Sequence, residues 1–197
     1  MNLSTRMVVV LTSIGLLSGS FLAIVGQVTK ERILFNKKRE IEEAALRVVP
    51  GAKSIQVIYE ERDFTVFQEK DEQGRVVGYA LQASGTGFQD EIVLGVGVNS
   101  ELTKLFSLTI IDQKETPGLG AKITEEASFL RYWQDRDCTQ PLQLRKPPVE
   151  DPKSLAANEV NTITGATISS KSVLNIVNQA IAKARQLREE GKLGSEK

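Results

Sequence analysis

The pattern of apolar and polar residues divides the chain into a membrane part and a globular part. Residues 7–28 read MVVVLTSIGLLSGSFLAIVGQV, without a charged side chain. At about 1.5 Å per residue, a helix of this length crosses the roughly 30 Å hydrocarbon core of a bilayer. Helical spacing of apolar residues continues among charged ones until Pro50-Gly51, a pair that ends helices. We therefore expect an N-terminal tail (residues 1–6), a transmembrane helix (7–28) and a juxtamembrane helix (29–51).

From residue 52 onward, short alternating stretches bounded by turn residues predict β-strands. The five predicted strands are Ser54–Glu60, Asp63–Gln68, Arg75–Gln82, Ile92–Val98 and Leu105–Ile111. The first two are close enough to form a hairpin, and DEQG (71–74) predicts the turn before the third. These segments indicate a largely antiparallel sheet of about five or six strands.

Two helices are predicted beside this sheet. One covers Glu125–Gln134, with Thr124 as its N-cap and an apolar side that includes Trp133. The other is C-terminal, begins at Ser169 or Ser170 and frays beyond Arg185. Its apolar stripe comprises Val173, Ile176, Val177, Ala180, Ile181 and Ala184. The expected fold is α+β: an N-terminal transmembrane helix, then one globular domain (52–190) with a central, largely antiparallel sheet flanked by helices, and a flexible tail (191–197).

Composition narrows the chemistry of this domain. The 197 residues carry a formal net charge of +0 and no stripe of basic and aromatic side chains, which argues against nucleic-acid binding. Histidine is absent and Cys138 is the single cysteine. We therefore exclude zinc enzymes, Ser-His-Asp hydrolases, His-ligated haem proteins and disulfide scaffolds.

The membrane segment has two open questions. A retained anchor is favoured over a cleaved signal peptide, because the apolar core is long and no A-x-A site follows it. Five basic residues follow the segment whereas Arg6 alone precedes it, so the positive-inside rule places the domain in the cytoplasm. Neighbouring acidic residues partly offset this signal. Composition alone leaves the side of the membrane undecided.

The first candidate site is TGAT, Thr164–Thr167, directly before the last helix. The free amides of a helix N-terminus form an anion site, and the small Gly165 and Ala166 allow close approach. A phosphate there would be within reach of the hydroxyls of Thr164 and Thr167. The alternative is an ordinary Thr/Ser-rich helix start.

The second candidate site is KETPGLGAK, Lys114–Lys122. Pro117-Gly118 predicts a turn and Gly120 a second bend, which leaves Leu119 at the tip, where a flat aromatic ligand could stack. Glu115, Thr116 and Lys122 would supply polar contacts. The alternative is a tight β-to-α connection.

A third candidate, SGTGFQ (Ser84–Gln89), begins like a dinucleotide-binding fingerprint but lacks the third glycine and a following helix. We interpret it as a glycine-rich loop between strands that could flank a ligand held by the other two sites.

Four stretches occur in an order that resembles one family over nearly the whole chain: AALRVVPGA, GYAL with SGTGF, ETPGLGAK and VNTITGAT. This family comprises the FMN-binding G subunits of Rnf-type ion-translocating electron transport complexes. The chain is also similar to the C subunits of sodium-translocating NADH:quinone oxidoreductases, although its compact length favours the former.

The resemblance implies an electron carrier in a membrane-bound ferredoxin:NAD oxidoreductase complex, with FMN joined by a phosphoester to Thr167. It implies partners among the other proteins of the complex, a flavin transferase and membrane lipid, and a domain on the outer side of the cytoplasmic membrane. No catalytic acid, base or metal is expected. The residues expected to contact the flavin are Thr164, Gly165, Ala166, Ser169, Ser170, Glu115, Thr116, Gly118, Leu119, Gly120, Lys122, Ser84 and Gly85.

Two positions depart from the family pattern. Asn161 stands where an aspartate is usual, and Gln113 stands where a histidine is common. Two other functions are consistent with the residues alone. One is a flavin-free extracytoplasmic binding or assembly module, and the other is a phosphotransferase that uses TGAT as a phosphate cradle.

Overall fold

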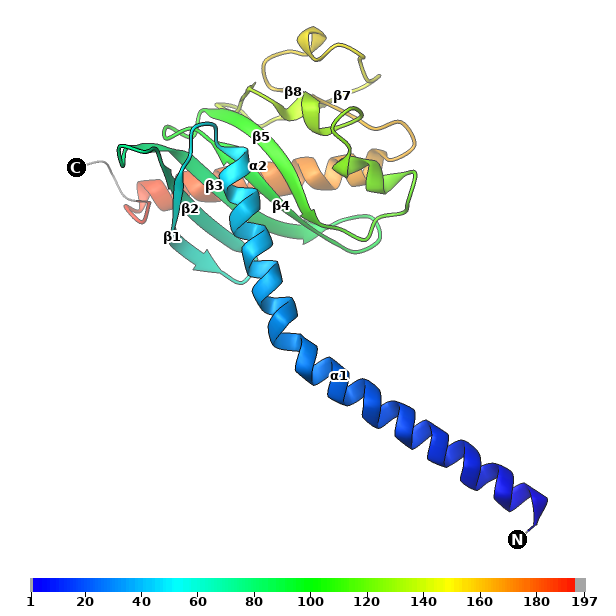
Figure 1. Ribbon diagram of the computed structural model, residues 1–197. Coiled ribbons are helices and arrows are strands. Elements are labelled where there is room, and N and C mark those ends of the chain that lie inside the picture. Colours follow the sequence, from blue (N-terminus) through cyan, green and yellow to red (C-terminus); the bar gives the residue numbers. More distant parts are fainter. Residues whose placement is uncertain (1, 194–197) are drawn as a thin grey trace. The chain divides into compact units, whose positions relative to one another are not determined.

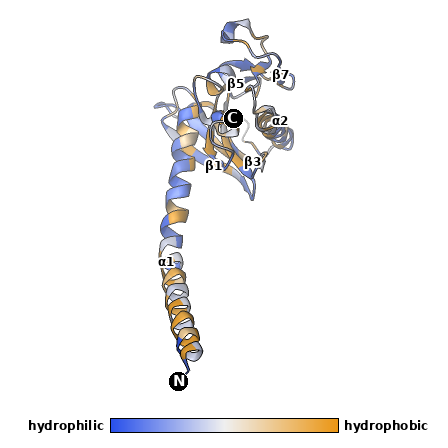
Figure 2. Ribbon diagram, turned by 90° about the vertical axis from the view of Figure 1, so that its right-hand side faces the viewer, coloured by the Kyte–Doolittle hydropathy of each residue, from blue (hydrophilic) through white to orange (hydrophobic). Residues whose placement is uncertain are grey.

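The computed structural model describes residues 2–193, and the chain divides into two compact units, residues 1–40 and residues 41–197. A single helix, α1 (Leu3–Val48), begins in the first unit and ends in the second. Within the described residues, it alone is long and apolar enough to cross a membrane, and none of its most apolar window is buried. Apolar residues are concentrated in its N-terminal part (Figure 2). The predicted transmembrane and juxtamembrane helices are therefore continuous, and Gly51 (φ +82°) follows the helix end as expected.

The globular unit is built on a six-stranded antiparallel sheet (Figure 1). Each strand pairs with its neighbours in the chain, in the order β1-β2-β3-β4-β5-β6. The strands are β1 (Ser54–Glu61), β2 (Phe64–Lys70), β3 (Val76–Thr86), β4 (Glu91–Val98), β5 (Lys104–Asp112) and β6 (Arg136–Asp137). The five predicted strands and the hairpin are confirmed.

Three short strands were not predicted. They are β6 and the parallel pair β7 (Gln143–Arg145) and β8 (Glu159–Asn161), which forms a second sheet. Each is two or three residues long, too short to show an alternating pattern. The α+β class is nevertheless confirmed.

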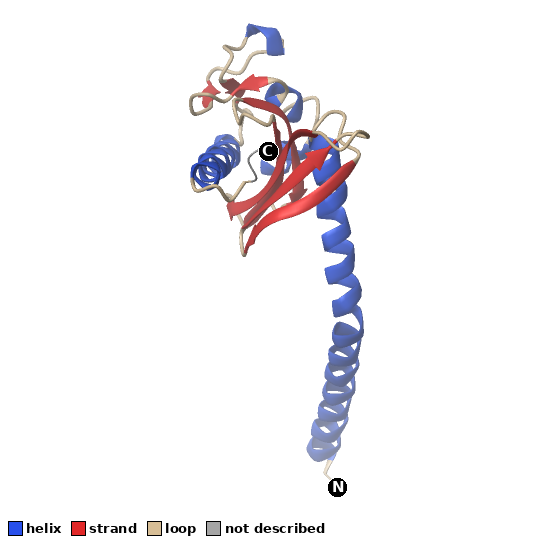
Figure 3. Ribbon diagram, turned by 90° about the vertical axis from the view of Figure 1, so that its left-hand side faces the viewer, coloured by secondary structure: helices blue, strands red, loops and turns tan. Residues whose placement is uncertain are grey.

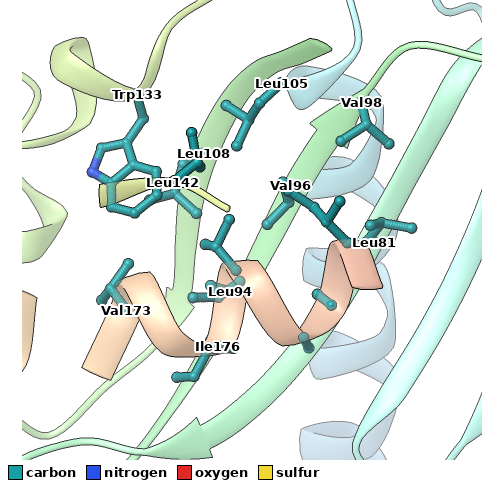
Figure 4. Close-up of a cluster of buried hydrophobic side chains, with 14 of the residues drawn as sticks. Leu81, Leu94, Val96, Val98, Leu105, Leu108, Trp133, Leu142, Val173 and Ile176 are labelled. Atoms are coloured by element: carbon teal, nitrogen blue, oxygen red, sulfur yellow. The ribbon is translucent and has the colours of Figure 1, made fainter. Parts of the chain in front are cut away.

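One face of the large sheet is covered by α2 (Thr167–Glu189), which packs on β3 (Figure 3). The predicted apolar stripe of this helix is buried, and it meets the side chains of the central strands (Figure 4). Leu94 lies beside Val173 and Ile176, whereas Leu81 lies toward the C-terminal end of the helix. This layer contains the main core and holds the N-terminal end of α2 at one edge of the sheet.

The opposite face of the sheet receives the last turn of α1. Ala45 and Val48 pack with Val49 against Phe67 of β2 and Ala80 of β3. A Cβ atom at Gly97 would lie 1.9 Å from the carbonyl oxygen of Val48, so only glycine permits this approach. The same carbonyl accepts a hydrogen bond from Ser107 Oγ at 3.1 Å.

The predicted helix Glu125–Gln134 is wrong. In its place lie turn residues and one 3₁₀ turn, η2 (Leu130–Trp133). Thr124 ends a separate, preceding 3₁₀ turn, η1 (Gly120–Thr124), and its hydroxyl donates to the Ala121 carbonyl at 2.9 Å instead of capping a helix. Within η2, the N–H groups of Leu130 and Arg131 bond carbonyls five residues back, and that of Tyr132 only three back. This change of spacing interrupts a regular α-helix. A further 3₁₀ turn, η3, covers Pro152–Ser154.

The C-terminal end of α2 extends beyond the predicted fraying point at Arg185. The helix continues to Glu189, because Leu187 is buried as well. The Lys192 N–H bonds the Leu187 carbonyl at 2.8 Å and Leu193 is 1% exposed. Residues 194–197 of the expected tail, and residue 1 of the N-terminal tail, lie outside the described residues.

Candidate functional site

A pocket of about 280 Å³ lies where two of the sequence motifs meet. It is formed by the turn after β5, the turn between β3 and β4, and the start of α2. Its lining residues are Phe88, Glu115, Thr116, Leu119, Gly120, Gly165, Ala166, Thr167, Ile168 and Ser169. The structure thus brings TGAT and PGLG together, although the two are far apart in the sequence.

The tip of the PGLG turn faces the tip of TGAT. Gly118 has φ +76°, and the N–H groups of Leu119 and Ala121 both bond the Thr116 carbonyl at 3.1 Å. Leu119 is left 50% exposed at the tip, as predicted. A Cβ atom at Gly165 would lie 3.5 Å from Leu119 Cδ2, so the PGLG and TGAT turns lie within contact distance of each other.

The start of α2 has no side-chain cap. Thr167 is the first helical residue, Ala166 is the N-cap, and the first helical hydrogen bond runs from Ser170 N to Ala166 O at 3.0 Å. The predicted N-caps, Ser169 and Ser170, instead lie inside the first turn. Within residues 2–193, the N–H groups of Thr167, Ile168 and Ser169 have no acceptor. A helix start with free amides attracts an anion.

The hydroxyl groups around this helix start differ in their bonding. Ser170 is fully buried; its Oγ accepts from Ile163 N and donates to Ala166 O, both at 3.0 Å. Ser169 Oγ donates to Glu115 Oε2 at 2.6 Å. Thr164 is exposed and does not line the pocket. Thr167 is half-buried, lines the pocket and makes no hydrogen bond through its hydroxyl within residues 2–193.

Glu115 is 4% exposed and lies at the inner end of the pocket. Its Oε1 accepts from the N–H groups of Phe88 at 2.7 Å and Gln89 at 3.1 Å. Its backbone N–H donates to Gln113 Oε1 at 2.6 Å. Thr116, on the pocket wall, donates from Oγ1 to Gln89 Oε1 at 3.0 Å. Glu115 therefore lines the pocket, as its predicted ligand contact requires, and also bonds protein groups from three segments.

Six of the predicted contact residues do not line this pocket: Thr164, Ser170, Gly118, Lys122, Ser84 and Gly85. Lys122 belongs to η1 and does not line it. Ser84 and Gly85 lie in the last residues of β3, so the predicted loop begins later, at Gly87. Ser84 Oγ donates to Glu91 Oε1 at 2.8 Å, and a Cβ atom at Gly85 would collide with Ile176. These two residues pack α2 against the sheet and border a separate depression at its edge.

Two pocket residues were missed from the sequence. Phe88 is 62% exposed and Ile168 is 57% exposed, and both line the pocket with Leu119. A large apolar residue within a polar or glycine-rich loop is the signal that could have identified them. Among residues 2–193, no group of three or more His, Cys, Asp and Glu side chains is placed to hold a metal ion. Cys138 is buried, and burial raises the pKa of its thiol to about 11.

Comparisons with known proteins identify a family whose match spans this pocket. The FMN-binding domain family matches residues 87–182, a range that includes every residue of the pocket. The G subunit of the ion-translocating oxidoreductase complex of Methanosarcina acetivorans is 28% identical over 90% of this chain and 92% of its own. The G subunit of the Na(+)-translocating ferredoxin:NAD(+) oxidoreductase complex of Acetobacterium woodii is 33% identical over 55% of this chain and 49% of its own. The G subunit of the proton-translocating ferredoxin:NAD(+) oxidoreductase complex of Clostridium ljungdahlii is 27% identical over 84% of this chain and 83% of its own.

Two solved structures share the fold. The crystal structure of NqrC from Shewanella oneidensis superposes with a TM-score of 0.55 at 20% identity, covering 73% of this chain and 72% of that one. The crystal structure of the C subunit of Na(+)-translocating NADH-quinone reductase from Parabacteroides distasonis gives a TM-score of 0.53 at 24% identity, covering 68% and 64%.

Proposed function

Because the chain belongs to the family of FMN-binding G subunits of ion-translocating oxidoreductase complexes, we propose that it carries electrons in such a complex on FMN esterified to Thr167. The complex is a membrane-bound ferredoxin:NAD oxidoreductase that moves ions. The runner-up, the C subunit of a sodium-translocating NADH:quinone oxidoreductase, is supported by similarity of fold alone.

The observation that carries this proposal is the position of the Thr167 hydroxyl. Thr167 lines the pocket, and its hydroxyl has no protein partner within residues 2–193, at the first residue of a helix with three free amides. A serine or threonine N-cap would stabilise such a helix by about 0.5–2 kcal/mol relative to alanine. Because Ala166 has no side-chain acceptor, the helix lacks that stabilisation, and the amides of its first turn remain free to bind a phosphate.

The residues of the pocket fit the other parts of FMN as well. The apolar side chains of Phe88, Leu119 and Ile168 are exposed around the pocket and would cover a flat ring system. When bound, the flavin supplies the electron transfer, and the protein supplies position and surroundings. The chain itself then needs no catalytic acid or base.

Neighbouring hydroxyls are poorer attachment points than Thr167. Ser169 and Ser170 are buried and engaged in hydrogen bonds, so an enzyme could not reach either without breaking those bonds. Thr164 is exposed but outside the pocket. These differences support Thr167 as the residue that a flavin transferase modifies.

The chain is a single-pass membrane protein, and α1 is the segment that would contact lipid. We place the globular unit on the outer side of the cytoplasmic membrane, as the family resemblance implies, although the count of basic residues favours the opposite side. A covalent tether suits that location, because a reversibly bound cofactor dissociates where its free concentration falls below Kd.

The test is to produce the full chain with and without a flavin transferase and to purify it in detergent. We expect a band that fluoresces in a denaturing gel only after co-expression. The peptide that contains Thr167 should gain the mass of FMN less one water. Colourless protein of unmodified mass from the co-expressed sample would overturn the proposal and favour a flavin-free binding or assembly module.

A further inference from the structure

The first turn of α2 is held in place without using its free amides. The Ser169 hydroxyl donates sideways to Glu115 Oε2 at 2.6 Å, and the Ser170 hydroxyl bonds Ile163 and Ala166. Ordinarily an N-cap side chain accepts from the amide of the second or third helical residue, which fixes the turn but occupies that donor. Here the serine hydroxyls fix the turn, and the amides remain available.

Glu115 connects this turn to the rest of the pocket. One carboxylate oxygen accepts from the N–H groups of Phe88 and Gln89, and the other accepts from Ser169. The side chain therefore joins the loop after β3, its own loop after β5, and the start of α2. It accepts three hydrogen bonds from the protein, so most of its capacity as an acceptor is used within the fold.

The backbone leaves room for this carboxylate at two glycines. A Cβ atom at Gly87 would lie 2.3 Å from Glu115 Oε1, and one at Gly120 would lie 2.5 Å from Oε2 and 2.7 Å from Ser169 Oγ. Neither glycine has a positive φ, so space around Glu115, and not backbone conformation, excludes a side chain there.

We infer that Glu115 is a positioning residue for cofactor attachment. Through Ser169, it takes over the role of the missing N-cap, so that the Thr167 hydroxyl and the three free amides face the pocket in a fixed arrangement. This inference rests on the proposed function, since it assumes that the pocket receives the FMN phosphate at Thr167. A merely structural Glu115 would support stability without affecting the rate of attachment.

The experiment compares initial rates of flavin incorporation into the full detergent-solubilised chain by a flavin transferase. The variants are Glu115→Gln, Ser169→Ala and the double variant. Glutamine keeps the size of the side chain and an oxygen for the Phe88 and Gln89 amides. Its NH₂ group can only donate, so the charged acceptor of the Ser169 hydroxyl is lost and at most a neutral bond of reversed direction replaces it. Each single variant should slow incorporation about tenfold or more, the range expected for loss of a hydrogen bond to a charged group. The double variant should be no slower than the slower single variant, because both remove one interaction.

Asn178→Ala is the matched control. Asn178 lies on the same helix, and its side chain makes two hydrogen bonds to the Leu142 backbone, at 2.9 and 3.0 Å, outside the pocket. It should lower Tm as the test variants do, yet leave the incorporation rate unchanged. If Glu115→Gln fails to fold, Ser169→Ala probes the same bond from its other end.

The outcomes separate this inference from the proposed function. If the unsubstituted chain gains no flavin at Thr167, the proposed function fails. If it gains flavin, but the two single variants gain it at the same rate or slow no more than Asn178→Ala, only the positioning role of Glu115 is wrong. Additive slowing in the double variant would also overturn it.

Discussion

Asn161 holds Val149 by both of its backbone groups. Its Nδ2 donates to the Val149 carbonyl at 2.6 Å, and its Oδ1 accepts from the Val149 N–H at 3.0 Å. Asn161 is 3% exposed and ends β8, directly before the segment that leads to TGAT. Its side-chain amide thus ties the loop after β7 to the strand that precedes the proposed attachment site. The residue that departs from the family pattern therefore has a structural role in this chain.

We expect Asn161→Asp to lower the free energy of unfolding by about 1–3 kcal/mol, because a carboxylate cannot donate to the Val149 carbonyl. Urea denaturation measures this change, and Asn158→Asp is the control, since Asn158 is only partly buried and bonds the Pro141 carbonyl at 3.3 Å. The side chain of Asn161 is not part of the pocket, so flavin incorporation should not become faster. Faster incorporation would mean that the transferase reads a carboxylate at this position.

Thr167→Val should abolish covalent flavin while preserving the fold. The hydroxyl has no protein partner within residues 2–193, and valine has nearly the same shape, so the free energy of unfolding should change by less than about 1 kcal/mol. Gel fluorescence and peptide mass report the flavin, and thermal unfolding reports the fold. Thr164→Val is the matched control within the same motif and should retain flavin. Full incorporation into Thr167→Val would place the linkage on another residue.

Gly120→Ala tests the space that Glu115 and Ser169 occupy. Its Cβ would approach both within 2.7 Å, so the pair must move apart. Overpacking of this kind destabilises by about 1–3 kcal/mol, and incorporation of flavin should slow as well. At Gly118, φ is +76° and nothing lies within 4 Å of a Cβ, so Gly118→Ala adds only backbone strain of about 1–2 kcal/mol. We expect both variants to lose a similar amount of Tm and only Gly120→Ala to incorporate flavin more slowly. Equal incorporation rates in the two variants would contradict the prediction.

Glu69 makes the stability of the globular unit depend on pH. It lies on β2, is fully buried, and neither carboxylate oxygen has a hydrogen-bond partner within residues 2–193. Burial raises its pKa from 4.5 to about 8. Because the folded state favours protonated Glu69, its contribution to the free energy of unfolding is fully present below about pH 4.5. This contribution is lost as the pH rises toward 8. The loss is at most about 4–5 kcal/mol, from 1.36 kcal/mol per pKa unit.

Urea denaturation at pH 5 and pH 8.5 measures this loss. The chain has no histidine, so few other groups titrate between these values. Glu69→Gln is uncharged at both values and should show a much flatter pH dependence, with Glu60→Gln, an exposed position on β1, as the control. A slope that persists in Glu69→Gln would assign the pH dependence to another group.

Long, regularly patterned segments were predictable from the sequence. Two segments keep one pattern of apolar residues over several helical turns: residues 7–28 and the stripe from Val173 to Ala184. Both lie in helices. The five strands likewise combine alternation with turn residues at their ends. In contrast, Glu125–Gln134 has the composition of a helix, yet backbone bonds of mixed spacing interrupt it.

The candidate site was predictable as two motifs but not as an arrangement. TGAT and PGLG could each be found from glycine and threonine spacing, because turns require those residues locally. The roles of Glu115 and Ser169 depend on contacts between segments that are distant in the chain. No local pattern distinguishes a buried, hydrogen-bonded carboxylate from an exposed one.

The order of the strands has a consequence for biosynthesis. Every strand of the large sheet pairs with its sequence neighbour, so the sheet can assemble progressively as the polypeptide leaves the ribosome. The helix that carries Thr167 is made last, and its amides and hydroxyl are presented only when it docks on the finished sheet. Chains interrupted before that point would lack both the helix that covers the core face of the sheet and the threonine that a transferase would modify. Attachment of the flavin would thus mark chains in which this helix has been made and has docked.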